Sequence, residues 1–224
     1  MKYLLILTAV AICSPVFAQT FSDGTFSSSD WSLLVIEFGP GGSASAYQES
    51  AGGNPGSFRW YTHTVNEPTP TEGSLIHVYH IREDAVWDPS ADGPIESVGF
   101  SEDRMTEEIT STIMIGGTIA LRQNGVFFWS NTAYTIDHGG WQTLSAGGLL
   151  SSDFRASVDS TLHPDFTTMG EPIYFGFMRA NSRDAGYPGT VTTSGGTDNS
   201  SVSVTPSPVA VESASWSQIK RRFR

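Results

Sequence analysis

The sequence predicts an all-β protein, a single jelly-roll β-sandwich of two antiparallel sheets. Apolar residues recur with a period near two in many short segments, and helical periodicity is almost absent. Clusters of Gly, Pro, Asn, Asp and Ser separate these segments, which is typical of sandwiches and jelly rolls. The clearest single unit is the pair Asn124-Gly125, a preferred type I′ turn, between two stretches that alternate as paired strands do.

The chain begins with a segment typical of a secretory signal peptide. Lys2 precedes a short apolar run over residues 3–12, and Ala18 is a small residue that suits signal peptidase. The run is shorter than the roughly 20 residues that a membrane helix needs. We therefore expect residues 1–18 to be removed and the mature protein to be secreted, periplasmic or at the cell surface. Cleavage would also remove Cys13, the one cysteine, so stability must come from core burial.

Residues 19–204 are expected to fold as one jelly-roll domain, because a chain of this length can bury a core of its own. The segment Leu149–Phe154 predicts a single helical turn, and the absence of internal repeats disfavours a propeller or solenoid. The expected strands, in chain order, are Trp31–Phe38, Ser43–Glu49, Ser57–Val65, Leu75–Arg82, Ile95–Ser101, Thr118–Gln123, Val126–Asn131, Trp141–Leu144, Ile173–Arg179 and Ser200–Val204.

The C-terminal residues differ from the domain in composition. Residues 205–211 are rich in Pro and Ser and predict an extended linker. In the tail, residues 212–224, the side chains of Trp216, Ile219 and Phe223 would share one helical face beside a cluster of positive charges. Such a tail could dock on a membrane surface or on secretion machinery, pack on the acidic domain, or fray. The sequence leaves these alternatives open.

The domain is strongly acidic. Residues 19–204 hold 22 acidic residues and seven arginines but no lysine, which gives a formal charge of −15. This charge repels phosphate backbones, so nucleic acid is excluded as an expected partner. We also expect no transmembrane segment. The acidity serves either solubility outside the cell or the binding of a divalent cation, and the sequence does not decide between them.

The order of several short motifs resembles a known kind of protein. It resembles bacterial secreted jelly-roll domains of the carbohydrate-binding-module and lectin-like kind, and more closely a set of uncharacterised secreted proteins. The resemblance spans residues 21–204 and implies the sandwich fold and, by analogy alone, the binding of glycans. The motifs that carry it are Phe21–Phe26, Gly52–Gly56, Leu121–Gly125, Trp141–Leu144, Ile173–Phe177 and Thr197–Val204.

The resemblance also implies a structural calcium ion. In such modules an acidic residue at the head of the last strand often binds Ca²⁺ together with groups from the N-terminal segment. Asp198 matches the first position and Asp23 the second. Calcium takes six to eight oxygen ligands, many of them backbone carbonyls that a sequence does not reveal. The alternative is that Asp198 only caps a turn before the strand.

Sugar recognition needs flat aromatic rings for the apolar faces of pyranoses and planar donors for their hydroxyl groups. Strand alternation places Arg122, Phe127 and Trp129 on one face of the Asn124-Gly125 hairpin, opposite the apolar core face. The alternative is that these rings are covered, as Trp and Phe usually are. Three further candidates share one side of an earlier strand, namely Arg59, Tyr61 and His63.

Catalytic motifs are weak by comparison. His77 and His80 are three apart on an expected strand, so their side chains point to opposite faces and cannot share a zinc ion. The acidic residues lack the alternate spacing that would pair carboxylates for glycoside hydrolysis, and no Gly-x-Ser-x-Gly motif occurs. A polysaccharide lyase stays possible in principle, because Arg59, Tyr61 and His63 are the residue types it uses.

The sequence therefore predicts a secreted, non-catalytic binding module for glycan or polysaccharide. Two alternatives stay open: a structural or adhesive cell-surface protein that binds another protein, and a weakly marked polysaccharide-degrading enzyme.

Overall fold

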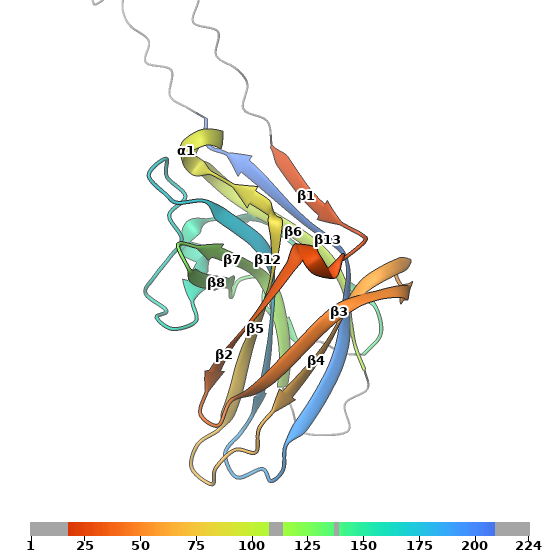
Figure 1. Cartoon of the computed structure of the whole chain (residues 1–224). Coiled ribbons are helices and arrows are strands. Elements are labelled where there is room, and N and C mark those ends of the chain that lie inside the picture. The colour runs from red at the N-terminus through yellow and green to blue at the C-terminus, as the bar shows by residue number, and fades with distance from the viewer. Residues whose placement is uncertain (1–17, 108–113, 137–138, 209–224) are drawn as a thin grey trace, which may run out of the picture.

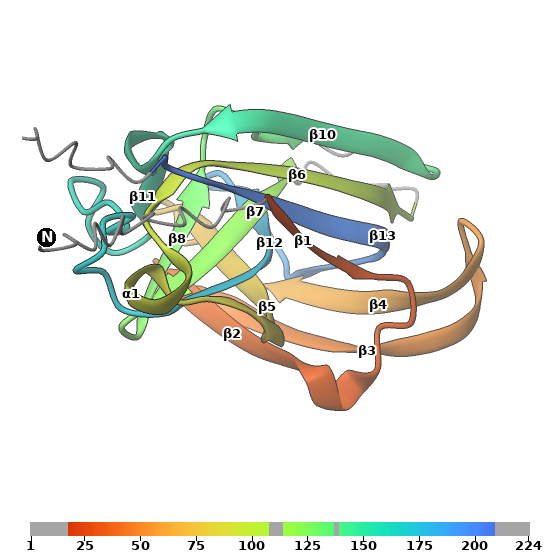
Figure 2. The same ribbon diagram turned by 90° about the horizontal axis from the view of Figure 1, so that it is seen from above.

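The chain folds into a two-layered β-sandwich. A computed structural model describes residues 18–107, 114–136 and 139–208 (Figure 1). Seen from above, the two sheets form separate layers on either side of a common interior (Figure 2). All strand pairings among the described residues are antiparallel. The predicted fold class, an all-β sandwich of two antiparallel sheets, is confirmed.

Sheet A has the strand order β10-β6-β13-β4-β3, with β1 paired along β13. Its strands are β1 (Gln19–Asp23), β3 (Gly42–Gly53), β4 (Gly56–Val65), β6 (Ile95–Thr106), β10 (Gln142–Leu149) and β13 (Val191–Pro206).

Sheet B has the order β11-β8-β7-β12-β5-β2, with β9 paired to β7. Its strands are β2 (Trp31–Phe38), β5 (Ser74–Trp87), β7 (Met114–Gln123), β8 (Val126–Ser130), β9 (Thr135–Ile136), β11 (Phe154–Ala156) and β12 (Ile173–Arg183). The short helices are 3-10 turns at Ser28–Asp30 and Ser151–Asp153 and the single turn α1 (Pro89–Asp92).

The predicted hairpin is present as β7 and β8. Asn124 and Gly125 have φ angles of 49° and 73°, the left-handed values that a type I′ turn requires. The register places Arg122 opposite Phe127 and Leu121 opposite Phe128, as the sequence predicted. This turn fixes which hairpin side chains share a side of the hairpin.

One part of the interior is an apolar core. It lies between the hairpin of sheet B and strands β6 and β13 of sheet A. Burying one such side chain contributes about 1.5–3 kcal/mol relative to leaving it exposed. Its largest members include Trp87, Phe100, Ile119, Leu121, Phe128, Phe154, Phe166, Ile173 and Phe175.

Another part of the interior is polar. We call it the polar layer: Arg59 and His63 of β4, His80 of β5, Glu102 of β6, and Arg179 and Asn181 of β12, all at most 2% exposed. Arg179 Nη1 lies 3.1 Å from Glu102 Oε1. Arg59 Nε donates to His80 Nδ1 over 3.0 Å, and His63 Nδ1 donates to Asn181 Oδ1 over 2.7 Å. The buried charges are thus held by partners from the facing sheet.

The structure differs from the sequence prediction mainly at short and glycine-containing strands. Strands β1, β9 and β11 were not predicted, and β13 begins at Val191 rather than Ser200 because the Gly195-Gly196 pair lies within a strand. The predicted helical turn near residue 150 is confirmed as the 3-10 turn Ser151–Asp153.

The signal-peptide and tail predictions fall on residues 1–17 and 209–224, outside the described part of the chain. Within that described part, no helix is long and apolar enough to cross a membrane.

Candidate functional site

The hairpin residues lie on the outer face of sheet B, the face turned away from sheet A. Arg122, Phe127 and Trp129 are half-buried there, while their strand neighbours Leu121 and Phe128 face the apolar core. The expectation that these three side chains face away from the sandwich interior is confirmed. Whether they bind a ligand stays a prediction.

The outer face of sheet B holds a small buried apolar cluster, on which Phe127, Trp129 and Tyr174 pack. Tyr79 of β5 and Phe127 of β8 are three strands apart and four residues apart along the strand direction. In a flat sheet their Cα atoms would be separated by about 19 Å. Their ring centroids are nevertheless 5.2 Å apart, and those of His77 and Trp129 are 5.6 Å apart. Sheet twist therefore brings two corners of this face together.

Two arginine–aromatic stacks lie on this face. The Arg122 guanidinium lies 4.3 Å from the Tyr174 ring centroid, and the Arg155 guanidinium lies 4.3 Å from that of Trp129. Arg122 also donates two hydrogen bonds to Glu83, of 2.8 and 2.7 Å. These hydrogen bonds lower the pKa of Glu83. Each guanidinium therefore lies over an aromatic ring, and that of Arg122 is also held by Glu83.

A serine that the sequence analysis did not single out joins the two sides of this face. Ser157 follows β11, and its Oγ lies 2.6 Å from His77 Nδ1 and 2.5 Å from the Tyr79 hydroxyl oxygen. Burial raises the pKa of Tyr79, so its hydroxyl stays protonated in this contact. Burial, and then the nearby Arg155, lowers the pKa of His77 to about 4. His77 is therefore neutral at pH 7, and its Nδ1 shares a hydrogen bond with the serine hydroxyl.

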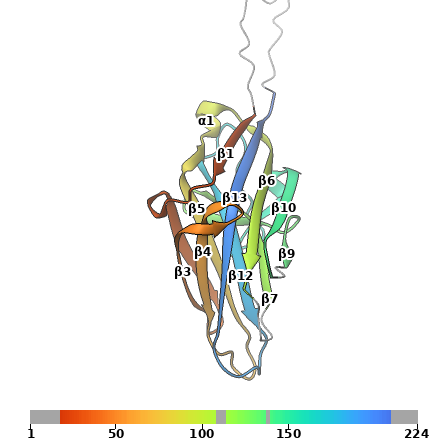
Figure 3. The same cartoon turned by 90° about the vertical axis from the view of Figure 1, so that its right-hand side faces the viewer.

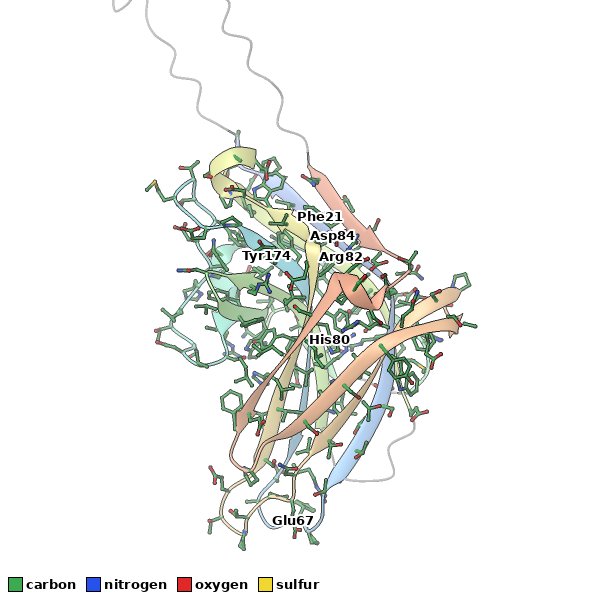
Figure 4. The ribbon with its side chains drawn as sticks, in the orientation of Figure 1. Phe21, Glu67, His80, Arg82, Asp84 and Tyr174 are labelled. Atoms are coloured by element: carbon green, nitrogen blue, oxygen red, sulfur yellow. The ribbon has the colours of Figure 1, made fainter. Side chains whose placement is uncertain are left out.

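The sequence could have identified Tyr174 and Tyr79 as outer-face residues by strand alternation, because both of their strands were predicted. In the structure, Tyr174 lies in the same half of the molecule as Arg82 and Asp84, whereas Glu67 lies at the opposite end (Figure 4). The contacts of Ser157 had no local signal, since Ser157 and His77 are 80 residues apart in sequence.

The other predicted trio is placed differently. Arg59, Tyr61 and His63 do share one side of β4, but that side faces the interior, where they are 2%, 1% and 0% exposed. The expectation that they face a ligand at the surface is therefore wrong. Burial lowers the pKa of Arg59 to about 10, an effect that Asp23 opposes. Burial also lowers the pKa of His63 to about 4, so both residues belong to the polar layer.

The prediction that His77 and His80 cannot share a metal is confirmed. His77 contacts the Trp129 ring on the outer face, whereas His80 stacks on Phe177 in the interior with ring centroids 4.4 Å apart. Figure 4 shows His80 near the middle of the molecule. Among the described residues, no group of three or more His, Cys, Asp or Glu side chains could hold a metal ion.

The two predicted calcium ligands, Asp23 and Asp198, accept hydrogen bonds from groups around them. Asp23 Oδ1 accepts hydrogen bonds from Thr25 N, Thr25 Oγ1 and Phe26 N, and Oδ2 accepts one from the Trp31 indole. Burial opposes its charge, but these hydrogen bonds together lower the pKa of Asp23. Asp198 accepts from the backbone amides of Asn54 and Asn199. Both carboxylates thus serve as turn and loop caps, and calcium binding stays an untested prediction.

Comparisons with known proteins give no family. No protein-family model matches the chain, and no curated protein sequence matches it. Among solved structures, the chain is similar to a family 11 carbohydrate-binding module from Clostridium thermocellum, in complex with a β-1,3-1,4-mixed-linked tetrasaccharide. The two share 16% identity and a TM-score of 0.43, over 87% of this chain and 98% of that one.

Two further carbohydrate-binding modules show the same level of similarity. A module described for specific mannan recognition shares 8% identity and a TM-score of 0.42, over 84% of this chain and 99% of its own. The C-terminal family 22 module of Clostridium thermocellum Xyn10B shares 12% identity and a TM-score of 0.40, over 80% and 88%. At such low identities and TM-scores, these likenesses carry no conclusion about function.

Proposed function

We propose that this chain is an exported, non-catalytic module that binds glycan or another polysaccharide through the outer face of sheet B. The observation that carries the proposal is the pair of arginine–aromatic stacks, Arg122 with Tyr174 and Arg155 with Trp129, on one face. Such a face offers apolar ring surface and fixed planar donors side by side, which is the combination that a sugar ring with its hydroxyl groups needs.

The stacks are also rigid before any ligand arrives. Glu83 holds Arg122 in place with two hydrogen bonds, and Ser157 links Tyr79 to His77 beneath the Trp129 ring. Side chains that are already ordered lose less conformational entropy on binding. A preorganised face of this kind favours a recognition surface.

The chemistry of the face favours binding over catalysis. Glu83 is engaged by both of its oxygens with Arg122, and its pKa is lowered by those hydrogen bonds. A general acid for glycoside hydrolysis instead needs a raised pKa and a second carboxylate about 5 to 9.5 Å away. Glu83 therefore suits hydrogen bonding to a sugar hydroxyl better than proton transfer.

The test is a binding survey with soluble and insoluble polysaccharides, followed by isothermal titration of those that bind. We expect Trp129→Ala to weaken binding by about tenfold or more, since truncating a central aromatic anchor typically costs 2 kcal/mol or more. Tyr187→Ala is the matched control, because Tyr187 is 45% exposed in a loop tied to residue 69 at the end of the molecule near Glu67.

Three outcomes would count against the proposal: no polysaccharide binds, a folded Trp129→Ala variant binds as tightly as the parent, or the chain binds only a protein partner. Release of unsaturated or reducing ends from a polysaccharide would instead support an enzyme.

The export part of the proposal rests on the N-terminal sequence, Lys2 followed by the apolar run and Ala18. We expect the exported protein to begin at Gln19. Its intact mass will check this, and a mature protein that retains Met1 would contradict it.

A further inference from the structure

The outer face of sheet A carries a second group of aromatic side chains. We call it the aromatic row: Tyr47 of β3, Phe58 and Trp60 of β4, and Trp141 just before β10. Phe58 contacts Trp60 and Trp141 edge to face, with ring centroids 5.9 and 5.4 Å apart. Tyr47 is the register partner of Trp60. Figure 3 shows the strands that the row crosses, in the order β3, β4, β13 and β6.

The row combines a buried anchor with accessible rings. Phe58 is 4% exposed, whereas Trp60 and Trp141 are half-buried and Tyr47 is 47% exposed. Phe58 therefore supports the row, while its three neighbours present ring surface to solvent. Exposed aromatic surface of this extent on a folded domain usually marks an interaction site.

A glycine in mid-strand makes room for the row. A Cβ atom added at Gly196 of β13 would lie 2.7 Å from Phe58 Cδ2 and 3.1 Å from Trp141 Cη2. A glycine inside a strand weakens the strand and often marks a close approach of another group to the backbone. Here the approaching groups are the two rings, which lie directly against the backbone of β13.

Hydroxyl groups continue the face along the same strands. Thr62 Oγ1 lies 3.2 Å from Ser194 Oγ, and Thr64 Oγ1 lies 3.0 Å from Thr192 Oγ1. By alternation, Ser43 and Ser45 of β3 share this face, because they are the register partners of Thr64 and Thr62. We call these six residues the hydroxyl ladder.

The face carries carboxylates at the row but no positive charge on β3, β4 and β13. From the ladder up to the row its members on these strands are Ser43, Ser45, Tyr47, Trp60, Thr62, Thr64, Thr192, Ser194 and Gly196. By alternation, Glu49 and Asp198 follow on the same face, and Glu49 hydrogen-bonds to Tyr47. An acidic polymer would meet these carboxylates and no countercharge, whereas a neutral ligand rich in hydroxyl groups meets both ring faces and hydroxyl partners. Charge matching therefore favours a neutral polysaccharide over an acidic polymer.

We propose that the outer face of sheet A, formed by the aromatic row and the hydroxyl ladder, is a second and independent binding surface for a neutral polysaccharide. This goes beyond the proposed function, because the two faces lie on opposite sides of the sandwich and cannot be occupied by one stretch of the same polymer chain. A module with both faces active would join two polysaccharide chains.

The experiment uses the full chain and a panel of neutral polysaccharides, namely cellulose, xylan, mannan and mixed-linkage β-glucan, with alginate as the charged comparison. Trp129→Ala is introduced first, so that the remaining binding reports on sheet A. We expect the Trp129→Ala protein to retain binding to a neutral polysaccharide, with little change between 50 and 500 mM salt, since uncharged contacts are not screened. Adding Trp60→Ala should weaken this binding by about tenfold or more.

A second variant, at an exposed position, tests the same face in case Trp60→Ala does not fold. Ser45 is an exposed member of the hydroxyl ladder, so Ser45→Glu adds a charge within the ladder with little strain. We expect Ser45→Glu to weaken the residual binding several-fold, while Thr168→Glu, at an exposed loop position away from this face, leaves it unchanged.

The possible results separate this inference from the function proposed for sheet B. If Trp129→Ala removes all binding, or if Trp60→Ala and Ser45→Glu leave the residual binding unchanged, the second surface is overturned and the first stands. If Trp60→Ala removes all binding and Trp129→Ala has no effect, only the sheet A surface stands. If Trp60→Ala instead converts a dimer into a monomer in light scattering without altering polysaccharide binding, the face joins two copies of the chain and the inference is overturned.

Discussion

Two trios of similar composition end on opposite sides of their sheets. Arg59, Tyr61 and His63 of β4 lie between the sheets, where the arginine bonds to His80. The hairpin trio, Arg122, Phe127 and Trp129, lies on an outer face, where the arginine stacks on Tyr174 and bonds to Glu83. An arginine among aromatic rings is therefore compatible with an interior polar layer and with a recognition surface, and residue type alone does not separate them.

The difference comes from what occupies the opposite side of each strand. In the hairpin, the other side carries Leu121 and Phe128, which have no polar atoms and fill the apolar core. In β4, the other side carries Phe58 and Trp60, so both sides of the strand are aromatic and the alternation gives no direction. If the comparison is right, substitutions in the interior change stability and those on the outer face change binding.

The largest expected effect is in the polar layer. Arg179→Met should lower the free energy of unfolding by about 3–5 kcal/mol, because it leaves Glu102 as a buried charge without its partner. Urea denaturation measures the change. The double variant Arg179→Met/Glu102→Met should regain most of this stability, since no buried charge is then left. If Arg179→Met alone is as stable as the parent protein, water reaches this part of the interior and the prediction is wrong.

The second effect is a loss of stability in acid. The pKa of His63 is about 4 in the folded chain, below the ordinary value of 6.5 that applies when it is unfolded. As pH falls from 6.5 to 4, the unfolded chain binds a proton that the folded chain does not, so stability decreases across this window. The expected loss is about 3 kcal/mol from His63 alone.

Urea midpoints at pH 7, 6, 5 and 4 will measure this dependence. His80 and His77 also have lowered pKa values, so they add to the slope in the same direction. Burial causes the shift at His80 first, and Arg59, His63 and Arg179 add to it. His63→Gln should flatten the slope, and an unchanged slope in that variant would contradict the assignment.

The smallest expected effect on stability is at the outer face. Arg122→Lys should change the free energy of unfolding by less than about 1 kcal/mol, because the Arg122–Glu83 pair is partly exposed. Lysine cannot lie flat on Tyr174 and bind Glu83 by two parallel hydrogen bonds, so polysaccharide binding should fall about fivefold. Titration calorimetry and urea denaturation of the same variant provide both values. A large stability loss with unchanged binding would reverse the comparison.

The sequence predicted the strands and their register well where short-range signals, such as a preferred turn pair, are strong. The Asn124-Gly125 turn set the register of β7 and β8 and placed Arg122, Phe127 and Trp129 on one side of the hairpin. It was a poor guide where strands are short or contain glycines. β11 has three residues, and the Gly195-Gly196 pair of β13 reads as a turn until the rings of Phe58 and Trp141 are seen to occupy that space.

The candidate site shows the same division. Strand alternation could have identified Tyr79 and Tyr174 once their strands were known. It could not have identified the link from Ser157 to His77, which joins residues far apart in sequence, nor the approach of Tyr79 to Phe127 across three strands. Those contacts depend on how far sheet B twists, and twist accumulates over the whole sheet.

The sequence by itself determined that this chain forms strands, where most of them turn, and which side chains share a side of each strand. These are short-range properties, set by backbone geometry and by the period-two alternation of side chains. Only the tertiary structure decided which of the two sides became the interior. That choice depends on which sheet packs on which, and therefore on residues distant in sequence, such as the Arg179–Glu102 pair that lets charged side chains occupy the space between the sheets.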